Sequence, residues 1–297
     1  MQLLPDSQFL IYRDDLNHPT VSGNKLHKLK PSIEHACAQN YPAIASFGGP
    51  YSNHLHALAW ACRQAGLNSI GFVRGELHAQ LTPTLSDCQR WGMQLFPLAR
   101  REYRAYQERF ALDKSSFIDL SDQGFIELDG LVATSQRTLI VPEGGSNLAA
   151  IESVANAYRP LFDDPEFSSV THAVCATGTG ATMAGLRLAA PNSIQIIGVQ
   201  AVAEDDATIR RVKRWLDAEP INTSVVNGHL GGFAKRPQEL IDFTEQFEKQ
   251  RKIPLDPIYT AKVFYHLYKM HTDGYFDCKD RILIIHTGGL QGKRGVI

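Results

Sequence analysis

The chain has 297 residues, 21% of them charged, and a formal net charge of -1. This balance excludes a global positive field that would attract nucleic acid or an acidic membrane surface, and no apolar run approaches the roughly 18 residues of a membrane-spanning helix. The amino-terminal sequence lacks a signal-peptide pattern, and five scattered cysteines without a CxxC pair favour reduced thiols in the cytoplasm over disulfides or a zinc site.

The predicted elements alternate between short apolar runs and longer amphipathic stretches. A helix is expected from 55 to 65, and a second one over 204–217 whose charges would all lie at the surface. No element is assigned in 101–135, which is polar and weakly patterned. Apolar strands alternating with helices are typical of parallel sheets buried on both faces, so an α/β fold is predicted. The expected strands are residues 43–47, 68–73, 138–142, 173–176, 195–200 and 282–286.

The first segment whose side chains could take part in a reaction is Ser22-Gly23-Asn24-Lys25, at the start of an amphipathic stretch. Lysine is the side chain that forms an imine with an aldehyde. The second cation at Lys28 would lower the pKa of Lys25, which helps a lysine act as nucleophile and then as base. Taken alone, however, the pair fits a solvated helix better, because most lysines are exposed.

A glycine-rich junction between a strand and a helix follows at residues 48–54. Backbone N–H groups at such a junction can hold a carboxylate, and Ser52, Asn53 and His54 would add a hydroxyl, an amide and an imidazole. The competing interpretation is an ordinary helix N-cap with a structural histidine. The spacing of His54 and His56 is a weak hint of metal binding without a third ligand nearby, so no metal site is predicted.

The next loop, residues 177–182, has the sequence Thr-Gly-Thr-Gly-Ala-Thr between an apolar strand and a helical run. Its glycines allow backbone N–H groups to converge, its threonine hydroxyls add donors, and the helix N-terminus adds positive potential. These features predict a phosphate cradle, although a tight turn without a ligand has the same pattern. The loop is neither a P-loop nor a complete GxGxxG fingerprint.

Two late loops carry further hydroxyl groups. One contains Tyr259-Thr260 after Asp256-Pro257-Ile258, and the other is His286-Thr287-Gly288-Gly289 after the last strand. Thr260 or Thr287 would be able to hydrogen-bond the nitrogen of a bound aromatic ring. Either could equally be a helix cap or a turn residue.

The order of these motifs, from Tyr12-Arg13-Asp14-Asp15 to the loop that begins at His286, resembles the fold-type II pyridoxal-phosphate (PLP) enzymes related to the tryptophan synthase β chain. Within them the sequence is most similar to the 1-aminocyclopropane-1-carboxylate (ACC) deaminase and D-cysteine desulfhydrase family. The resemblance implies two open, twisted, mostly parallel sheets flanked by helices. Residues 34–140 would form a smaller domain and residues 1–33 and 141–297 a larger PLP-binding domain, with the active site in the cleft between them.

The resemblance also implies residue roles. Lys25 would hold PLP as an imine, Asn53 would contact the pyridine O3′, and Tyr259 would be the active-site tyrosine. Ser52 would contact the substrate carboxylate, in a substrate site shared with Asn53, His54 and Tyr259. The other residues expected to bind the cofactor are Thr177, Gly178, Thr179, Gly180, Thr182, Thr260 and Thr287.

Three positions depart from the ACC deaminase pattern. Thr260 replaces a glutamate and Thr287 replaces a leucine, and both changes resemble the D-cysteine desulfhydrase side. A neutral hydroxyl at the ring nitrogen makes a weaker electron sink, adequate for β-elimination but poorly suited to opening a cyclopropane. Phe233 stands where the family has a second active-site tyrosine, which puts desulfhydrase activity itself in question.

The predicted function is therefore α,β-elimination from a small amino acid, D-cysteine desulfhydrase-like, giving a 2-oxo acid and ammonia. Lys25, or Ser52 helped by Lys28, would remove the Cα proton, and family relatives suggest a homodimer. Rival hypotheses are ACC deamination, racemisation or dehydration at the same site, a PLP-binding protein without turnover, and a generic nucleotide-binding α/β protein.

Overall fold

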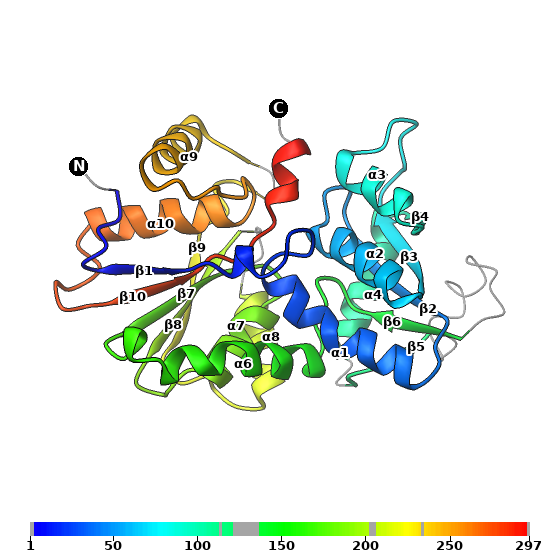
Figure 1. The fold of residues 1–297 in the computed structure, drawn as a ribbon, viewed down its shortest axis with the longest axis horizontal. Coiled ribbons are helices and arrows are strands. Elements are labelled where there is room, and N and C mark those ends of the chain that lie inside the picture. The colour runs from blue at the N-terminus through cyan, green and yellow to red at the C-terminus, as the bar shows by residue number, and fades with distance from the viewer. Residues whose placement is uncertain (1–2, 113–114, 121–136, 202–205, 233–234, 296–297) are drawn as a thin grey trace. The chain divides into compact units, whose positions relative to one another are not determined.

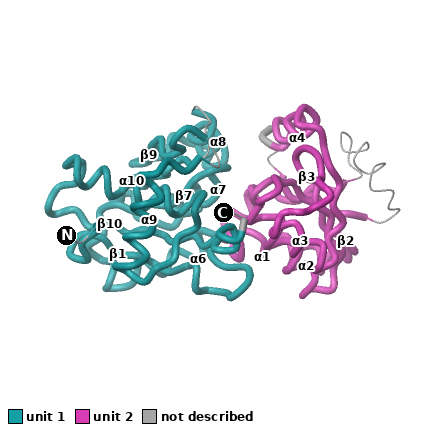
Figure 2. The backbone as a smooth tube through the Cα atoms, turned by 90° about the horizontal axis from the view of Figure 1, so that it is seen from above, with its two compact units in different colours: residues 1–24, 154–296 teal, residues 25–153, 297 magenta. Residues whose placement is uncertain are grey.

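A computed structural model describes residues 3–112, 115–120, 137–201, 206–232 and 235–295 (Figure 1). The chain forms two compact units (Figure 2). One contains the residues up to Asn24 together with those from Val154 onward, and the other contains Lys25 to Ser153. Among the described helices, none is both long enough and apolar enough to cross a bilayer.

The first unit is built on a five-stranded sheet in the order β1-β10-β7-β8-β9. Every neighbouring pair is parallel. The residues of β10 are all buried, as expected for an apolar strand covered on both faces. The bounds are β1 Phe9–Tyr12, β7 His172–Thr177, β8 Gln195–Gln200, β9 Thr223–Asn227 and β10 Ile282–Ile285.

Helices α9 and α10 lie on one side of this sheet, and α7 and α8 lie on the other (Figure 1). The core between α9, α10 and the sheet is rich in aromatic rings, among them Phe243, Phe247 and Phe264. The helices that belong wholly or partly to this unit are α6 Leu148–Asp163, α7 Ala181–Ala189, α8 Ala207–Leu216, α9 Gln238–Arg251 and α10 Thr260–Thr272, with short 3-10 turns at Asp14–Leu16, Pro165–Phe167 and Leu290–Gly295.

The second unit has a sheet in the order β4-β3-β2-β6-β5, parallel except for the last pair. Alternation along β2 decides what covers each face. Phe47 points toward α4 and packs against Tyr103 and Phe110, whereas its neighbour Ser46 bonds to His54 of α2. The bounds are β2 Ala43–Gly48, β3 Asn68–Arg74, β4 Gln94–Leu98, β5 Ile118–Asp119, β6 Thr138–Val141, α1 Asn24–Ala38, α2 Asn53–Ala65, α3 Pro83–Arg90 and α4 Arg100–Leu112.

The α/β fold with two mostly parallel sheets is confirmed, but the units divide the chain differently from the predicted domains. Residues 25–33 and 141–153 group with the smaller unit. The reason is that α1 is one continuous helix from Asn24, and that β6 pairs with β2 and brings the residues after it along. The unassigned stretch 101–135 contains most of α4 and all of β5, and residues 113–114 and 121–136 lie outside the described part.

Each sheet has a point where its strand order reverses. In the first unit the chain runs from β7 to β8 and β9 on one side, and then returns to place β10 on the other side of β7. In the second unit β2 is followed outward by β3 and β4, and β6 returns to its other side. Ligands of open α/β sheets bind outside the carboxyl ends of the strands at such switch points. Ligand-binding residues are therefore expected in the loops after β7 and β10 and in those after β2 and β6.

Candidate functional site

The loop from Thr177 to Thr182 joins β7 to α7 at the switch point of the first sheet. Gly180 is the N-cap of α7, with a φ of 95° and no side-chain capping bond. The Thr177 hydroxyl is buried and has no hydrogen-bond partner among the described residues. The Thr182 hydroxyl accepts a hydrogen bond from Asn24 Nδ2 at 2.8 Å, which leaves its own proton to donate. The loop therefore offers hydroxyl groups and a helix N-terminus to an anion.

The segment Ser22-Gly23-Asn24 lies against the other loop of this switch point. A Cβ on Gly23 would come within 2.0 Å of the Thr287 carbonyl oxygen, and Gly23 has a φ of +72°. Asn17 holds the same glycine from the side, with Oδ1 accepting from its N–H at 2.9 Å and Nδ2 donating to its carbonyl at 3.2 Å. Only glycine fits here, and the next residues in the chain are Asn24 and Lys25.

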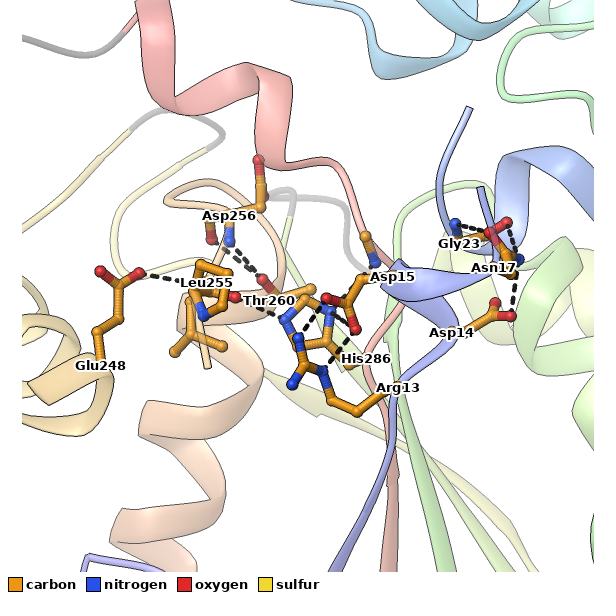
Figure 3. Close-up of polar contacts among 12 residues, drawn as sticks. Arg13, Asp14, Asp15, Asn17, Gly23, Glu248, Leu255, Asp256, Thr260 and His286 are labelled. Atoms are coloured by element: carbon orange, nitrogen blue, oxygen red, sulfur yellow. Dashed lines mark hydrogen bonds and ion pairs between the residues drawn. The ribbon is translucent and has the colours of Figure 1, made fainter. Parts of the chain in front are cut away.

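A buried ionic network supports the loop after β10 (Figure 3). The His286 ring is fully buried, with Nε2 2.8 Å from the Pro254 carbonyl oxygen and Nδ1 accepting from the Gly288 N–H at 3.3 Å. Asp15 Oδ1 lies 3.4 Å from Nδ1, and Arg13 pairs with the Asp15 carboxylate through two hydrogen bonds of 2.8 and 2.7 Å. Burial lowers the pKa of His286, although Asp15 opposes this shift. The neutral ring thus carries its proton on Nε2.

The neighbouring carboxylate, Asp14, anchors the chain just before Gly23. It accepts hydrogen bonds from Asn17 Nδ2 at 2.9 Å and from the Tyr158 hydroxyl at 2.7 Å (Figure 3 shows the first). Burial and this carboxylate raise the pKa of Tyr158 well above its ordinary value, so Tyr158 stays a hydrogen-bond donor. From the sequence, Arg13, Asp14 and Asp15 were only parts of a motif. In the structure they hold the loop after β10 and the chain before Gly23 in place.

Thr260 and Thr287 occupy different environments. Thr260 is the first residue of α10, and its hydroxyl accepts from the Asp256 N–H at 2.7 Å and donates to the Asp256 carbonyl at 3.3 Å. Asp256 Oδ1 in turn accepts from the N–H groups of Ile258 and Tyr259 at 3.1 and 2.5 Å. Thr287 is 7% exposed, and its hydroxyl makes no hydrogen bond within the described chain. Thr260 is thus committed to its own turn, whereas Thr287 is available to a ligand.

In the second unit, His54 and Lys28 converge on Gly145 at the switch point between β2 and β6. A Cβ on Gly145 would lie 3.4 Å from both His54 Cε1 and Lys28 Cβ. The Ser46 hydroxyl donates to the Val141 carbonyl at 2.7 Å, so it accepts from His54 Nε2, also at 2.7 Å. His54 therefore carries its proton on Nε2, and its buried Nδ1 has no partner among the described residues.

The charge state of His54 follows from its surroundings. Burial lowers the pKa of its imidazole well below the ordinary value, and the positive charges of Lys25 and Lys28 lower it further. All three residues belong to the same unit, with both lysines in the first turns of α1. His54 is 3% exposed and tied to Ser46, so its side chain is a buried neutral acceptor.

Ser52 is the N-cap of α2, and its oxygen accepts from the Leu55 N–H at 3.2 Å. A Cβ on Gly48 would lie 2.4 Å from the Ser52 oxygen, so glycine is needed at the end of β2 for this turn to close. Asn53 is the first residue of α2. The N-cap interpretation of the sequence and its binding interpretation are compatible here, because the Ser52 hydroxyl proton stays available.

Lys262 in α10 is a buried cation that sequence reasoning missed. Its ammonium group donates to the carbonyl oxygens of Ala201, His229 and Gly232 at 3.2, 3.0 and 2.8 Å. Burial lowers its pKa to about 8, and the Asp256 carboxylate opposes that shift. One side chain thus ties together the loops after β8 and β9. No sequence signal distinguishes such a lysine from an exposed one.

The predicted solvated helix over 204–217 needs a correction. Helix α8 spans Ala207–Leu216, and Arg211 on it is not a surface charge, because it bonds the backbone of the glycine loop. Phe233 lies outside the described residues. No group of three or more histidine, cysteine, aspartate or glutamate side chains able to hold a metal occurs in the described ranges.

Comparisons with known proteins bear on the family and the fold of the chain. Residues 3–288 match the family model described as pyridoxal-phosphate dependent enzyme. The chain is 28% identical, over 96% of its length and 73% of the other protein, to the bifunctional D-cysteine desulfhydrase/1-aminocyclopropane-1-carboxylate deaminase of Arabidopsis thaliana. It is 24% identical to the D-cysteine desulfhydrase of Salmonella schwarzengrund, with coverages of 95% and 87%. A solved ACC deaminase homologue superposes with a TM-score of 0.75 at 24% identity, covering 96% of this chain and 85% of that one.

Proposed function

Because this chain belongs to the family of pyridoxal-phosphate-dependent enzymes, we propose that it eliminates a β-substituent from a small amino acid, as the D-cysteine desulfhydrases do. The products would be a 2-oxo acid and ammonia. The observation that carries the assignment of the site is the hydrogen bond from Asn24 to Thr182. It joins the residue directly before Lys25 to the loop that suits a phosphate.

The residues present fit the cofactor in three respects. The Thr177 hydroxyl is a buried polar group that lacks a partner among the described residues, at the loop where the phosphate would bind. Gly180 has the positive φ with which backbone N–H groups turn toward an anion. On the other unit, His54 Nδ1 is a buried acceptor close to two lysines. These groups match a ligand with an anionic end and a lysine-reactive end.

The roles of the chain's own residues follow from their chemistry. Lys25 would hold the cofactor covalently, and the loop of Gly178, Thr179 and Gly180 would bind its phosphate with the hydroxyls of Thr177 and Thr182. Thr287 would hydrogen-bond its ring nitrogen. Asn53 contacts the ring oxygen. When bound, pyridoxal phosphate delocalises the electron pair left at Cα.

The substrate is bound by Ser52, Asn53 and Tyr259, with the Ser52 hydroxyl on the carboxylate. Lys25 would take up the Cα proton, or Ser52 would do so with Lys28 as its partner. His54 is a neutral acceptor close to Lys28, since both side chains border Gly145. A thiolate then leaves from Cβ, and hydrolysis of the product releases ammonia.

The assignment of Lys25 is tested with Lys25→Ala and a matched control, Lys30→Ala, on the same helix. Lys30 is exposed, and within the described residues its side chain makes only a long surface pair with Glu34, so its loss should be silent. We expect the Lys25 variant to lose the visible absorbance of the lysine-bound cofactor and turnover with every substrate. An unchanged spectrum in the Lys25→Ala protein would refute the assignment.

The substrate is tested by adding D-cysteine, L-serine and ACC to the purified enzyme and measuring 2-oxo acid and ammonia. Elimination from D-cysteine is expected, and ACC should react far more slowly, because Thr287 offers the ring nitrogen only a neutral hydroxyl and Thr260 stands where the ACC deaminases have a glutamate. Chiral inversion of the amino acid without 2-oxo acid would instead indicate a racemase. Colour without any product would indicate a binding protein that has lost turnover.

The assembly and compartment are part of the same proposal. We infer a homodimer from the relatives' type of fold, and sedimentation of the purified chain at micromolar concentration tests it. We also infer a reducing compartment such as the cytoplasm, because Cys62 and Cys88 are buried and form no disulfide with any described residue.

A further inference from the structure

Side chains of helix α8 donate hydrogen bonds to the backbone of the glycine loop, residues 177–182. Arg211 Nη2 donates to the Gly178 carbonyl and Arg211 Nε donates to the Thr179 carbonyl, both at 3.0 Å. The Thr208 hydroxyl also donates to the Gly178 carbonyl, at 3.2 Å, and Arg211 Nη2 lies 3.3 Å from that hydroxyl oxygen. Two successive peptide carbonyls therefore point toward α8.

These carbonyl directions fix the N–H directions. In a trans peptide the C=O and the N–H of the same unit point to opposite sides, and no cis peptide occurs in the described chain. The N–H groups of Thr179 and Gly180 belong to the two peptide units whose carbonyls Arg211 binds, so both point away from α8. Gly180 then takes a φ of +95°, and successive N–H groups turned by such a residue form an anion-binding nest.

The contact between loop and helix is also close. A Cβ on Gly180 would approach Val212 Cγ2 to 3.2 Å, and Thr208 Cγ2 and Trp215 Cζ3 to 3.4 Å. The loop therefore lies directly on α8, and the guanidinium on the carbonyl side polarises both peptide units in the direction that makes their N–H ends more positive. A planar guanidinium suits this task, since its fork reaches two carbonyl oxygens at once.

We propose that Arg211 is a positioning residue for cofactor binding, which orients the N–H groups of Thr179 and Gly180 toward the phosphate by holding their peptide carbonyls on α8. The proposal rests on the proposed function, in which this loop binds the phosphate of pyridoxal phosphate. Arg211 itself would not touch the cofactor, because it acts from the opposite side of the peptide planes.

The test compares pyridoxal phosphate with pyridoxal, which lacks the phosphate. The full chain is titrated with each compound, and the dissociation constants are obtained from the visible absorbance of the lysine-bound form. We expect Arg211→Met to weaken pyridoxal phosphate about tenfold, equivalent to about 1.4 kcal/mol, and to leave pyridoxal nearly unchanged. Thr208→Val, which removes one neutral donor, should weaken pyridoxal phosphate about threefold.

Arg210→Met is the matched control, because Arg210 is an exposed neighbour on the same helix without a side-chain bond in the described part of the chain. It should leave both constants unchanged, and Arg211→Lys should restore part of the lost selectivity. Equal weakening of both compounds by Arg211→Met, or no weakening of either, would overturn the positioning role. If the wild-type chain itself binds pyridoxal as tightly as pyridoxal phosphate, the phosphate assignment of the loop fails instead, and this inference fails with it.

Discussion

Thr260 and Thr287 are both candidates to hydrogen-bond the ring nitrogen of a cofactor, and their own hydrogen bonds distinguish them. The Thr260 hydroxyl is held by both backbone groups of Asp256 at the start of α10. The Thr287 hydroxyl has no such commitment within the described chain and lies in the loop that packs on Gly23. We therefore propose that Thr287 is the residue that faces a ligand, whereas Thr260 shapes the turn that carries Tyr259.

We predict that Thr287→Val and Thr260→Val have different effects. Thr287→Val should lower kcat/KM by about fivefold to tenfold, the size of one lost hydrogen bond, and leave the free energy of unfolding nearly unchanged. Thr260→Val leaves the buried Asp256 N–H without its acceptor and should lower that free energy by about 1–3 kcal/mol. Steady-state kinetics and urea unfolding measure the two effects, and the reverse pattern would assign the ring contact to Thr260.

Arg211 and Lys262 show why some important residues escape sequence reasoning. Both stand in helical stretches where a cation is normally a solvated surface residue. Their partners are backbone carbonyls of loops at least 30 residues away. Every residue has a backbone carbonyl, so the amino-acid sequence does not indicate which one accepts the bond. Only the folded chain identifies them.

At the scale of elements, the central strands were predictable and the edge strands were not. The buried strands β2, β3, β7, β8 and β10 have continuous apolar runs. By contrast, β4 at a sheet edge includes Pro97, and β9 at the other sheet's edge is only half-buried. Edge strands tolerate proline and polar side chains because one side of their backbone is unpaired.

The start of α1 depends on a single glycine, which gives an element-scale prediction. A methyl group at Gly23 would overlap the Thr287 carbonyl oxygen, and the φ of +72° is unfavourable for any L-residue with a side chain. Gly23→Ala should therefore lower the free energy of unfolding by about 3 kcal/mol or more and weaken cofactor binding, because Asn24 and Lys25 must shift.

The matched control is Gly66→Ala at the end of α2. Gly66 has nearly the same φ, +70°, but nothing lies within 4 Å of the added methyl group. Its expected cost is about 1 kcal/mol, with cofactor affinity unchanged. Urea unfolding and absorbance titration measure both variants, and equal costs at the two positions would show that contact with the Thr287 loop is unimportant.

At the scale of the whole molecule, each unit places its candidate residues at the carboxyl edge of its own sheet. The glycine loop and Thr287 follow β7 and β10, while Ser52 and Gly145 follow β2 and β6. Each pair of loops flanks the reversal of strand order. The candidate loops of each unit thus arise from the same topological feature, which occurs once in each sheet.

The buried histidine of the second unit makes stability depend on pH. The folded-state pKa of His54 lies well below its ordinary value of 6.5, so the unfolded chain binds the proton more readily. Its contribution to stability is present above about pH 6.5 and is lost as the pH falls, by about 1.4 kcal/mol per pH unit. His54→Gln, which is neutral at every pH, should remove this part of the acid sensitivity.

The measurement is the difference in unfolding free energy between wild type and His54→Gln, from pH 7.5 down to pH 5. We expect the advantage of the wild type to shrink steadily below pH 6.5. A difference that stays constant over this range would mean that burial does not hold His54 neutral.

The sequence by itself determined the α/β class, the central strands and the chemistry of the loops. Continuous apolar runs indicate strands that are buried on both faces, and local glycine-rich patterns indicate the junctions between strands and helices. It also determined the family resemblance, which rests on motifs in a given order. Only the tertiary structure decided which threonine is committed to its own turn, that the Ser46 bond holds the His54 proton on Nε2, and that Arg211 grips the glycine loop. Those outcomes depend on contacts between segments far apart in the chain, and the direction of a hydrogen bond exists only once the backbone has folded.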